Sequence, residues 1–124
     1  MKLVEEDRGA HSVLSISGTL ALGDATRALQ ERFEKLAKDR TGAVLLDLSG
    51  LEHLDSTAIG VFVGGLKKFD ALSRRFYIVN PRERVAAVFR ITHLDQVFRV
   101  FPSVDAALAV ANLPGKDEEE TGGR

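Results

Sequence analysis

Residues that could carry out chemistry concentrate between Asp47 and Gly60, and three of them are the residue types of a hydrolytic triad: His53, Asp55 and Ser56. A nucleophile, a base and an orienting acid must point at one another, which three residues within one turn of chain cannot do. The sequence also has neither a Gly-x-Ser-x-Gly nucleophile elbow nor a glycine-rich phosphate loop. We therefore expect no catalytic residues, and the chain is predicted not to be an enzyme.

A second chemistry open to this stretch is phosphate acceptance by the Ser56 hydroxyl. Asp55 is a typical helix N-cap, which places Ser56 in the first turn of a following helix. The positive end of the helix dipole favours a phosphate there, and phosphorylation adds roughly −1.5 to −2 charges at neutral pH. Such a modification would preserve the fold and change the charge of the surface.

Metal and cofactor chemistry has weaker support. His53 could reach a metal together with Asp47 or Asp55, but scattered ligands rarely make a site, and a surface or capping role for His53 is favoured. His11 and His93 belong to other elements and form no cluster. The chain has no cysteine, which excludes disulfides and thiolate ligands. We expect neither a metal nor a cofactor.

The elements around this stretch form a strand–turn–helix–strand pattern. The apolar run from Ala43 to Leu46, continued by Asp47 and Leu48, predicts a strand in the middle of a sheet, with helices on both sides. Helical spacing continues to about Asp70, and Phe76–Val79 has the composition of a second strand. This order predicts a βαβ crossover in an α/β fold, with Ser56 at the carboxyl edge of the sheet, where such folds present functional groups.

The remaining elements follow from turn and capping residues. Strands are predicted at Lys2–Glu6, His11–Ser17 and Val97–Phe101, with a hairpin turn at Asp7–Gly9. Helices are predicted at Asp24–Asp39 with Asp24 as N-cap, from Asn80 as N-cap, and through Val104–Ala111 with Ser103 as N-cap. We expect one domain over residues 1–111 and a disordered acidic tail over residues 112–124.

Composition narrows the classes of function. The 124 residues carry a net charge of −1 and are 44% apolar, so nothing in the overall charge indicates direct nucleic-acid binding. The longest apolar runs are too short to insert into a membrane, and the charged start of the chain does not resemble a signal peptide. We expect a cytoplasmic protein.

The helix that follows Asp55 has an unusual outer face. Its core side is apolar, and four residues are predicted on the opposite side: Thr57, Val61, Gly64 and Lys68. Glycine inside a helix lowers helix stability by about 1 kcal/mol relative to alanine, so the presence of Gly64 on this face calls for an explanation. Close packing against another element of the domain and a flat docking surface for a partner are both consistent with it.

Two motifs resemble the signature of STAS domains, and most closely that of bacterial anti-sigma factor antagonists. They are Val44-Leu45-Leu46-Asp47-Leu48-Ser49-Gly50-Leu51 and Leu54-Asp55-Ser56-Thr57-Ala58-Ile59-Gly60. The resemblance covers nearly the whole chain and implies a small, single-domain STAS-type mixed β-sheet packed with α-helices. It also implies that Ser56 is the phosphorylation site, with Asp55 its neighbour.

The resemblance implies a partner-switching function. The unphosphorylated protein would bind an anti-sigma factor through Asp55, Ser56, Thr57 and the outer face with Val61, Gly64 and Lys68. The anti-sigma factor would also be the serine kinase that modifies Ser56, and a PP2C-type phosphatase would restore the hydroxyl. A homodimer is left open.

The chain departs from the antagonist pattern at two places. Ala21 stands where antagonists commonly have an acidic residue near the phosphorylation site, and Thr57-Ala58 replaces Ser-Gly, which makes Thr57 a second candidate hydroxyl. An alternative function therefore stays open: a non-switching STAS subunit of a stress-signalling assembly or of an ABC-type lipid transport system, in which Ser56 is only a helix residue.

Overall fold

A computed structural model of the chain describes residues 1–21 and 23–114. In this part of the chain five strands form one sheet in sequential order: β1 (Lys2–Arg8), β2 (His11–Leu20), β3 (Val44–Leu54), β4 (Phe76–Val79) and β5 (Arg99–Phe101). β1 is antiparallel to β2, and every other neighbouring pair is parallel. The predicted α/β class and mixed sheet are confirmed.

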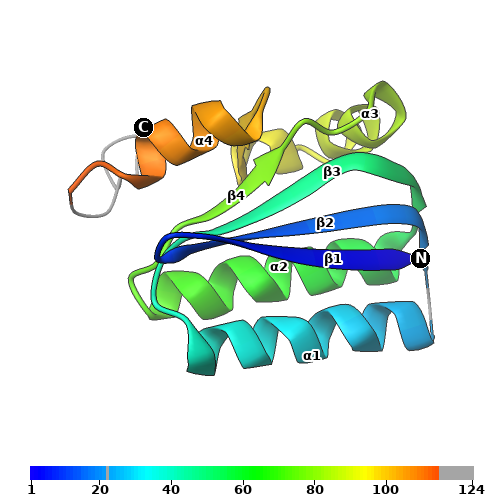
Figure 1. The fold of residues 1–124 in the computed structure, drawn as a ribbon. Helices are drawn as coiled ribbons and strands as arrows, with labels where there is room; N and C mark the ends of the chain where they lie inside the picture. The colour runs from blue at the N-terminus through cyan, green and yellow to red at the C-terminus, as the bar shows by residue number, and fades with distance from the viewer. Residues whose placement is uncertain (22, 115–124) are drawn as a thin grey trace.

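Helices cover both faces of the sheet (Figure 1). α1 (Asp24–Asp39) and α2 (Ser56–Ala71) lie side by side on one face, and α4 (Val104–Ala111) lies on the other. α3 (Glu83–Ile91) is followed by a short 3-10 helix, η1 (Leu94–Gln96), and packs Val85 and Phe89 into the same core as α1 and α2. No helix in the described residues is long and apolar enough to cross a membrane.

The central strand is longer than its sequence predicts. β3 continues to Leu54, so the segment from Ser49 onward, predicted as a turn, pairs with β2. The pairing shifts register near Gly50, where an added Cβ would lie 2.8 Å from the Cβ of Ser17. A side chain would therefore collide with the neighbouring strand, and glycine permits the irregularity. As a result only Asp55 separates β3 from α2.

Three predicted cap and turn positions are wrong. Asp24 is the first residue of α1 rather than its N-cap, a position held by Gly23 with φ 115°. Asn80 precedes α3 by three residues with φ 51°, and its N–H donates to the carbonyl of Phe101 at 2.7 Å. This hydrogen bond ties Asn80 to β5, and that tertiary contact keeps Asn80 from acting as the N-cap of α3. The hairpin turn lies at Gly9–Ala10, one step later than predicted.

Other local predictions agree with the structure. The bounds of α1, β4 and α4 are those predicted, and the Ser103 Oγ accepts from the Ala106 N–H at 3.1 Å as an N-cap should. The predicted tail falls mainly on residues 115–124, which lie outside the described residues.

Candidate functional site

The turn between β3 and α2 is held by two hydrogen bonds of Asp55, one through its side chain and one through its backbone N–H. The Asp55 carboxylate accepts from the Ala58 N–H at 2.9 Å, which makes Asp55 the N-cap of α2. The Asp55 N–H donates to the Leu20 carbonyl at 3.3 Å, so the end of β2 fixes the turn from the other side. Ala21, the position that departs from the antagonist pattern, directly follows this anchor.

Ser56 and Thr57 are the first two residues of α2, and both side chains are exposed. Beyond the Asp55 cap, the first turn of α2 contains no acidic residue, and the helix dipole favours negative charge there. Both hydroxyls can be reached from solvent, and an added anionic group would sit where the helix dipole favours it.

Val61 is not on the outer face, contrary to its prediction. Its side chain is only 8% exposed and belongs to the core shared with α1. α2 is covered by the sheet on one side and by α1 on another, so its buried arc is wider than the single stripe assumed from helical periodicity. Gly64 and Lys68 are exposed, as predicted.

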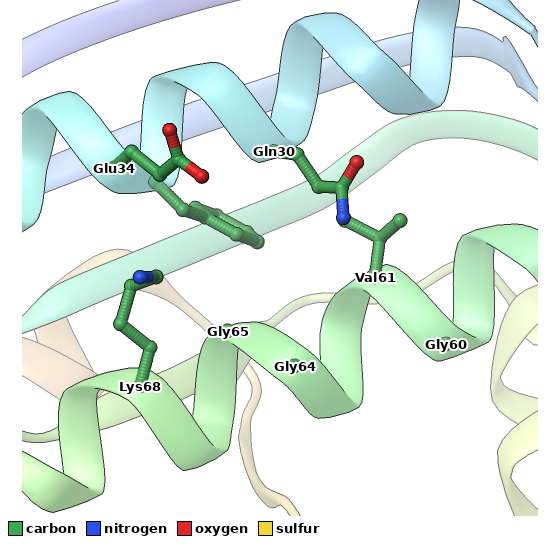
Figure 2. Close-up of a pocket in the computed structure, with 8 residues that line it drawn as sticks. Gln30, Glu34, Gly60, Val61, Gly64, Gly65 and Lys68 are labelled. Atoms are coloured by element: carbon green, nitrogen blue, oxygen red, sulfur yellow. The ribbon is translucent and has the colours of Figure 1, made fainter.

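A groove with a volume of about 240 Å³ runs between α1 and α2 (Figure 2). Phe33 and Val61 supply its apolar surface, while charged side chains of Glu34 on α1 and Lys68 on α2 lie at its rim. The remaining lining residues are Gln30, Gly60, Gly64 and Gly65. The groove is smaller than the 300–1,000 Å³ typical of small-molecule pockets, so it suits side chains of a partner better than a cofactor.

Sequence reasoning missed the α1 half of this groove, because only tertiary packing brings Gln30 and Glu34 beside α2. The usable signal was the glycine spacing on α2. A Cβ added at Gly60 or Gly64 meets no atom within 4 Å, so these two residues leave the groove open. Gly65 differs: its added Cβ would lie 2.7 Å from the Phe33 ring.

This contrast predicts opposite effects of the same substitution at neighbouring positions. Gly64→Ala should raise the free energy of unfolding by up to about 1 kcal/mol, because alanine favours the helix and has room. Gly65→Ala should lower it by about 1–3 kcal/mol, because the Phe33 ring is enclosed and must move. Urea denaturation of both variants measures this, and equal effects at the two positions would contradict the packing described.

The hydrogen bond of the His53 ring is to Arg84 of α3 and not to the Ser56 hydroxyl. Its Nδ1 lies 3.1 Å from a guanidinium nitrogen of Arg84, which donates to the ring. Arg82 on the same segment donates to the Ser49 carbonyl at 2.7 Å, so two arginines attach the start of α3 to β3. Among residues 1–21 and 23–114, no three His, Asp or Glu side chains gather closely enough to hold a metal ion.

Comparison with known proteins agrees with this fold and turn. The profile of the STAS domain family matches residues 2–107. A candidate anti-sigma factor antagonist of Thermotoga neapolitana is 34% identical over 76 residues, covering 61% of this chain and 67% of that protein. An anti-sigma-B factor antagonist of Staphylococcus aureus is 31% identical over 72 residues, covering 58% and 67% respectively.

The crystal structure of a candidate anti-sigma factor antagonist from Thermotoga maritima superposes with a TM-score of 0.83 at 21% identity, covering 90% of this chain and 95% of that one. At this identity the likeness concerns the fold alone. The profile match and this likeness agree. The chain belongs to the STAS domain family, and it is similar to proteins named anti-sigma factor antagonists.

Proposed function

We propose that this chain is an anti-sigma factor antagonist that works by partner switching. With Ser56 unmodified it binds an anti-sigma factor and thereby frees the sigma factor. The anti-sigma factor is also a serine kinase that phosphorylates Ser56 and so ends the complex, and a PP2C-type phosphatase restores the hydroxyl. The chain itself acts in this cycle as a binding protein.

The observation that carries the proposal is the position of Ser56 beside an open helix surface. Ser56 is exposed at the start of α2, and Gly60, one helical turn later, begins the groove between α1 and α2. The partner surface is therefore the Asp55–Thr57 turn together with Gly60, Gly64 and Lys68. Val61 contributes to it from within the groove, as part of the apolar lining.

Electrostatics makes a phosphate at this point an adequate switch. A unit charge held about 4 Å from a like charge costs about 4 kcal/mol at the effective dielectric constant of a protein surface. That free energy corresponds to nearly a thousandfold in affinity. The fold should tolerate the phosphate because the helix N-terminus favours an added anion, so the expected effect is on partner binding.

The experiment is an affinity purification of partners with the full chain, with and without ATP, followed by mass spectrometry of the peptide over residues 55–67. We expect an anti-sigma factor to be retained without ATP and lost with ATP, with phosphate on Ser56. The Ser56→Ala variant should retain the partner under both conditions. Retention regardless of ATP by the unmodified chain, with an ABC-type ATPase as the bound protein, would favour the non-switching alternative.

A further inference from the structure

The groove between α1 and α2 differs in charge between its two ends (Figure 2). The end nearer to Ser56 is lined by Gln30 and Gly60, which are uncharged. At the far end Glu34 lies at the rim on α1 and Lys68 at the rim on α2, and both side chains are exposed. Opposite charges therefore lie on the two walls of one end of the groove.

Neither charge has an ionic partner in the part of the chain that the structure describes. Among residues 1–21 and 23–114, no ion pair includes Glu34 or Lys68, although they lie on facing walls of one groove. The pair that Glu34 could form with Lys38, four residues later on the same helix, is not formed either. Each charge is therefore available to a charged group of another molecule.

The floor of the groove offers little apolar surface. Phe33 and Val61 supply it, but they are only 2% and 8% exposed, so nearly all of their area is already covered. A molecule in the groove would therefore meet mainly the backbone at Gly60 and Gly64 and the polar walls. Apolar burial contributes to affinity, whereas charges at the edge of a contact determine mainly which partner binds. The groove is thus better suited to selecting a partner than to supplying the affinity.

We propose that Glu34 and Lys68 select the anti-sigma factor, by pairing with one cationic and one anionic side chain of a segment of that protein that lies in the groove. This inference rests on the proposed function, since the same partner contacts Ser56 at the start of α2. It adds a requirement that the Ser56 turn does not contain, because the charges of the partner must match the order of the two walls. A protein with the reverse order would bring like charges together and be rejected.

Selection of the partner and its release use opposite ends of α2. At about 1.5 Å per residue, the helix rises about 18 Å from Ser56 to Lys68. That separation exceeds the Debye length of about 8 Å at physiological ionic strength, so a phosphate on Ser56 would have little effect on the contacts of Lys68. Phosphorylation therefore determines whether the partner stays bound, and the far end of the groove determines which partner it is.

Charge reversal tests the selection, with the anti-sigma factor recovered by the unmodified chain as the probe in titration calorimetry. We expect Glu34→Lys and Lys68→Glu each to weaken binding by about tenfold or more at physiological salt. The loss should be much smaller at about 1 M salt, where charges are screened within about 3 Å. Glu31→Lys and Lys67→Glu make the same changes at exposed positions outside the groove, and should bind within about twofold of the unmodified chain.

Combination with Ser56→Asp tests whether the two ends act separately. This substitution should weaken binding by the same factor in the Glu34→Lys chain as in the unmodified chain, to within about twofold, because distant sites are additive. A factor that depends on the residue at position 34 would contradict separate ends. A double-mutant cycle of Glu34→Gln and Lys68→Gln in urea denaturation needs no partner, and should show no coupling between the two walls. Coupling there would give the two charges a structural role and overturn the inference.

The outcomes also separate this inference from the proposed function. If Ser56→Asp weakens binding while both charge reversals leave it unchanged, the function stands and the groove does not select the partner. If no anti-sigma factor is recovered, the function fails and the inference fails with it. Sedimentation of the chain alone gives a further result: a dimer that Glu34→Lys dissociates would make a second copy the occupant of the groove and overturn the inference.

Discussion

Ser56→Asp should weaken binding of the anti-sigma factor by tenfold or more, and phosphorylation of Ser56 by up to about a thousandfold, because a like charge at the contact costs about 4 kcal/mol. Aspartate has less charge than phosphate and reaches less far, so the smaller factor applies to it. Titration calorimetry with the partner captured by the unmodified chain measures the difference, and Ser56→Ala should bind within about twofold of the unmodified chain.

The fold should be unaffected by this substitution. Ser56 is exposed and begins α2, where a negative side chain is favoured by the helix dipole, so the melting temperature should not fall. Thr41→Asp is a matched control, since it adds the same charge at an exposed site just after the C-terminal end of α1. If Ser56→Asp binds as tightly as Thr41→Asp, the Ser56 turn is not part of the partner surface.

Sequence periodicity predicted those elements whose signals are local. α1, β4 and α4 end where their apolar spacing and turn residues indicate, and the apolar run Ala43–Leu46 correctly predicted a central strand. The extension of β3 beyond Ser49 depends on pairing with β2, which no local pattern encodes. The misplaced cap at Asn80 has the same origin, because its N–H is taken by β5.

Residues of the candidate site also differ in whether local sequence alone could predict their positions. The Asp55 cap and the exposed Ser56 were predictable, since both follow from one turn of sequence. The face to which Val61 belongs was not, because helical periodicity cannot tell that a second helix will lie beside the first. For the same reason the glycines of α2 had no unique interpretation: Gly64 opens a groove and Gly65 permits contact with Phe33.

Phe33→Ala should lower the free energy of unfolding by about 3–5 kcal/mol and the melting temperature by at least about 12 °C. The ring is 2% exposed and packs edge-on against Phe76 and Phe69, with ring centroids 5.4 and 6.1 Å apart. Thermal denaturation measures the loss. Glu34→Ala, an exposed neighbour at the rim of the groove, should change the free energy of unfolding by no more than about 0.5 kcal/mol.

The same ring accounts for the cost predicted at Gly65, so the two substitutions should not be additive. In a Phe33→Ala background the two closest contacts of a Cβ at residue 65 are gone, and the next one is the Phe76 ring, at 3.0 Å. Gly65→Ala should then be neutral or stabilising, since alanine favours the helix by about 1 kcal/mol. A double-mutant cycle isolates this coupling. If Gly65→Ala costs as much without the ring as with it, then contact with Phe33 is not why residue 65 is glycine, and the close approach of α1 to α2 that forms the groove must have another cause.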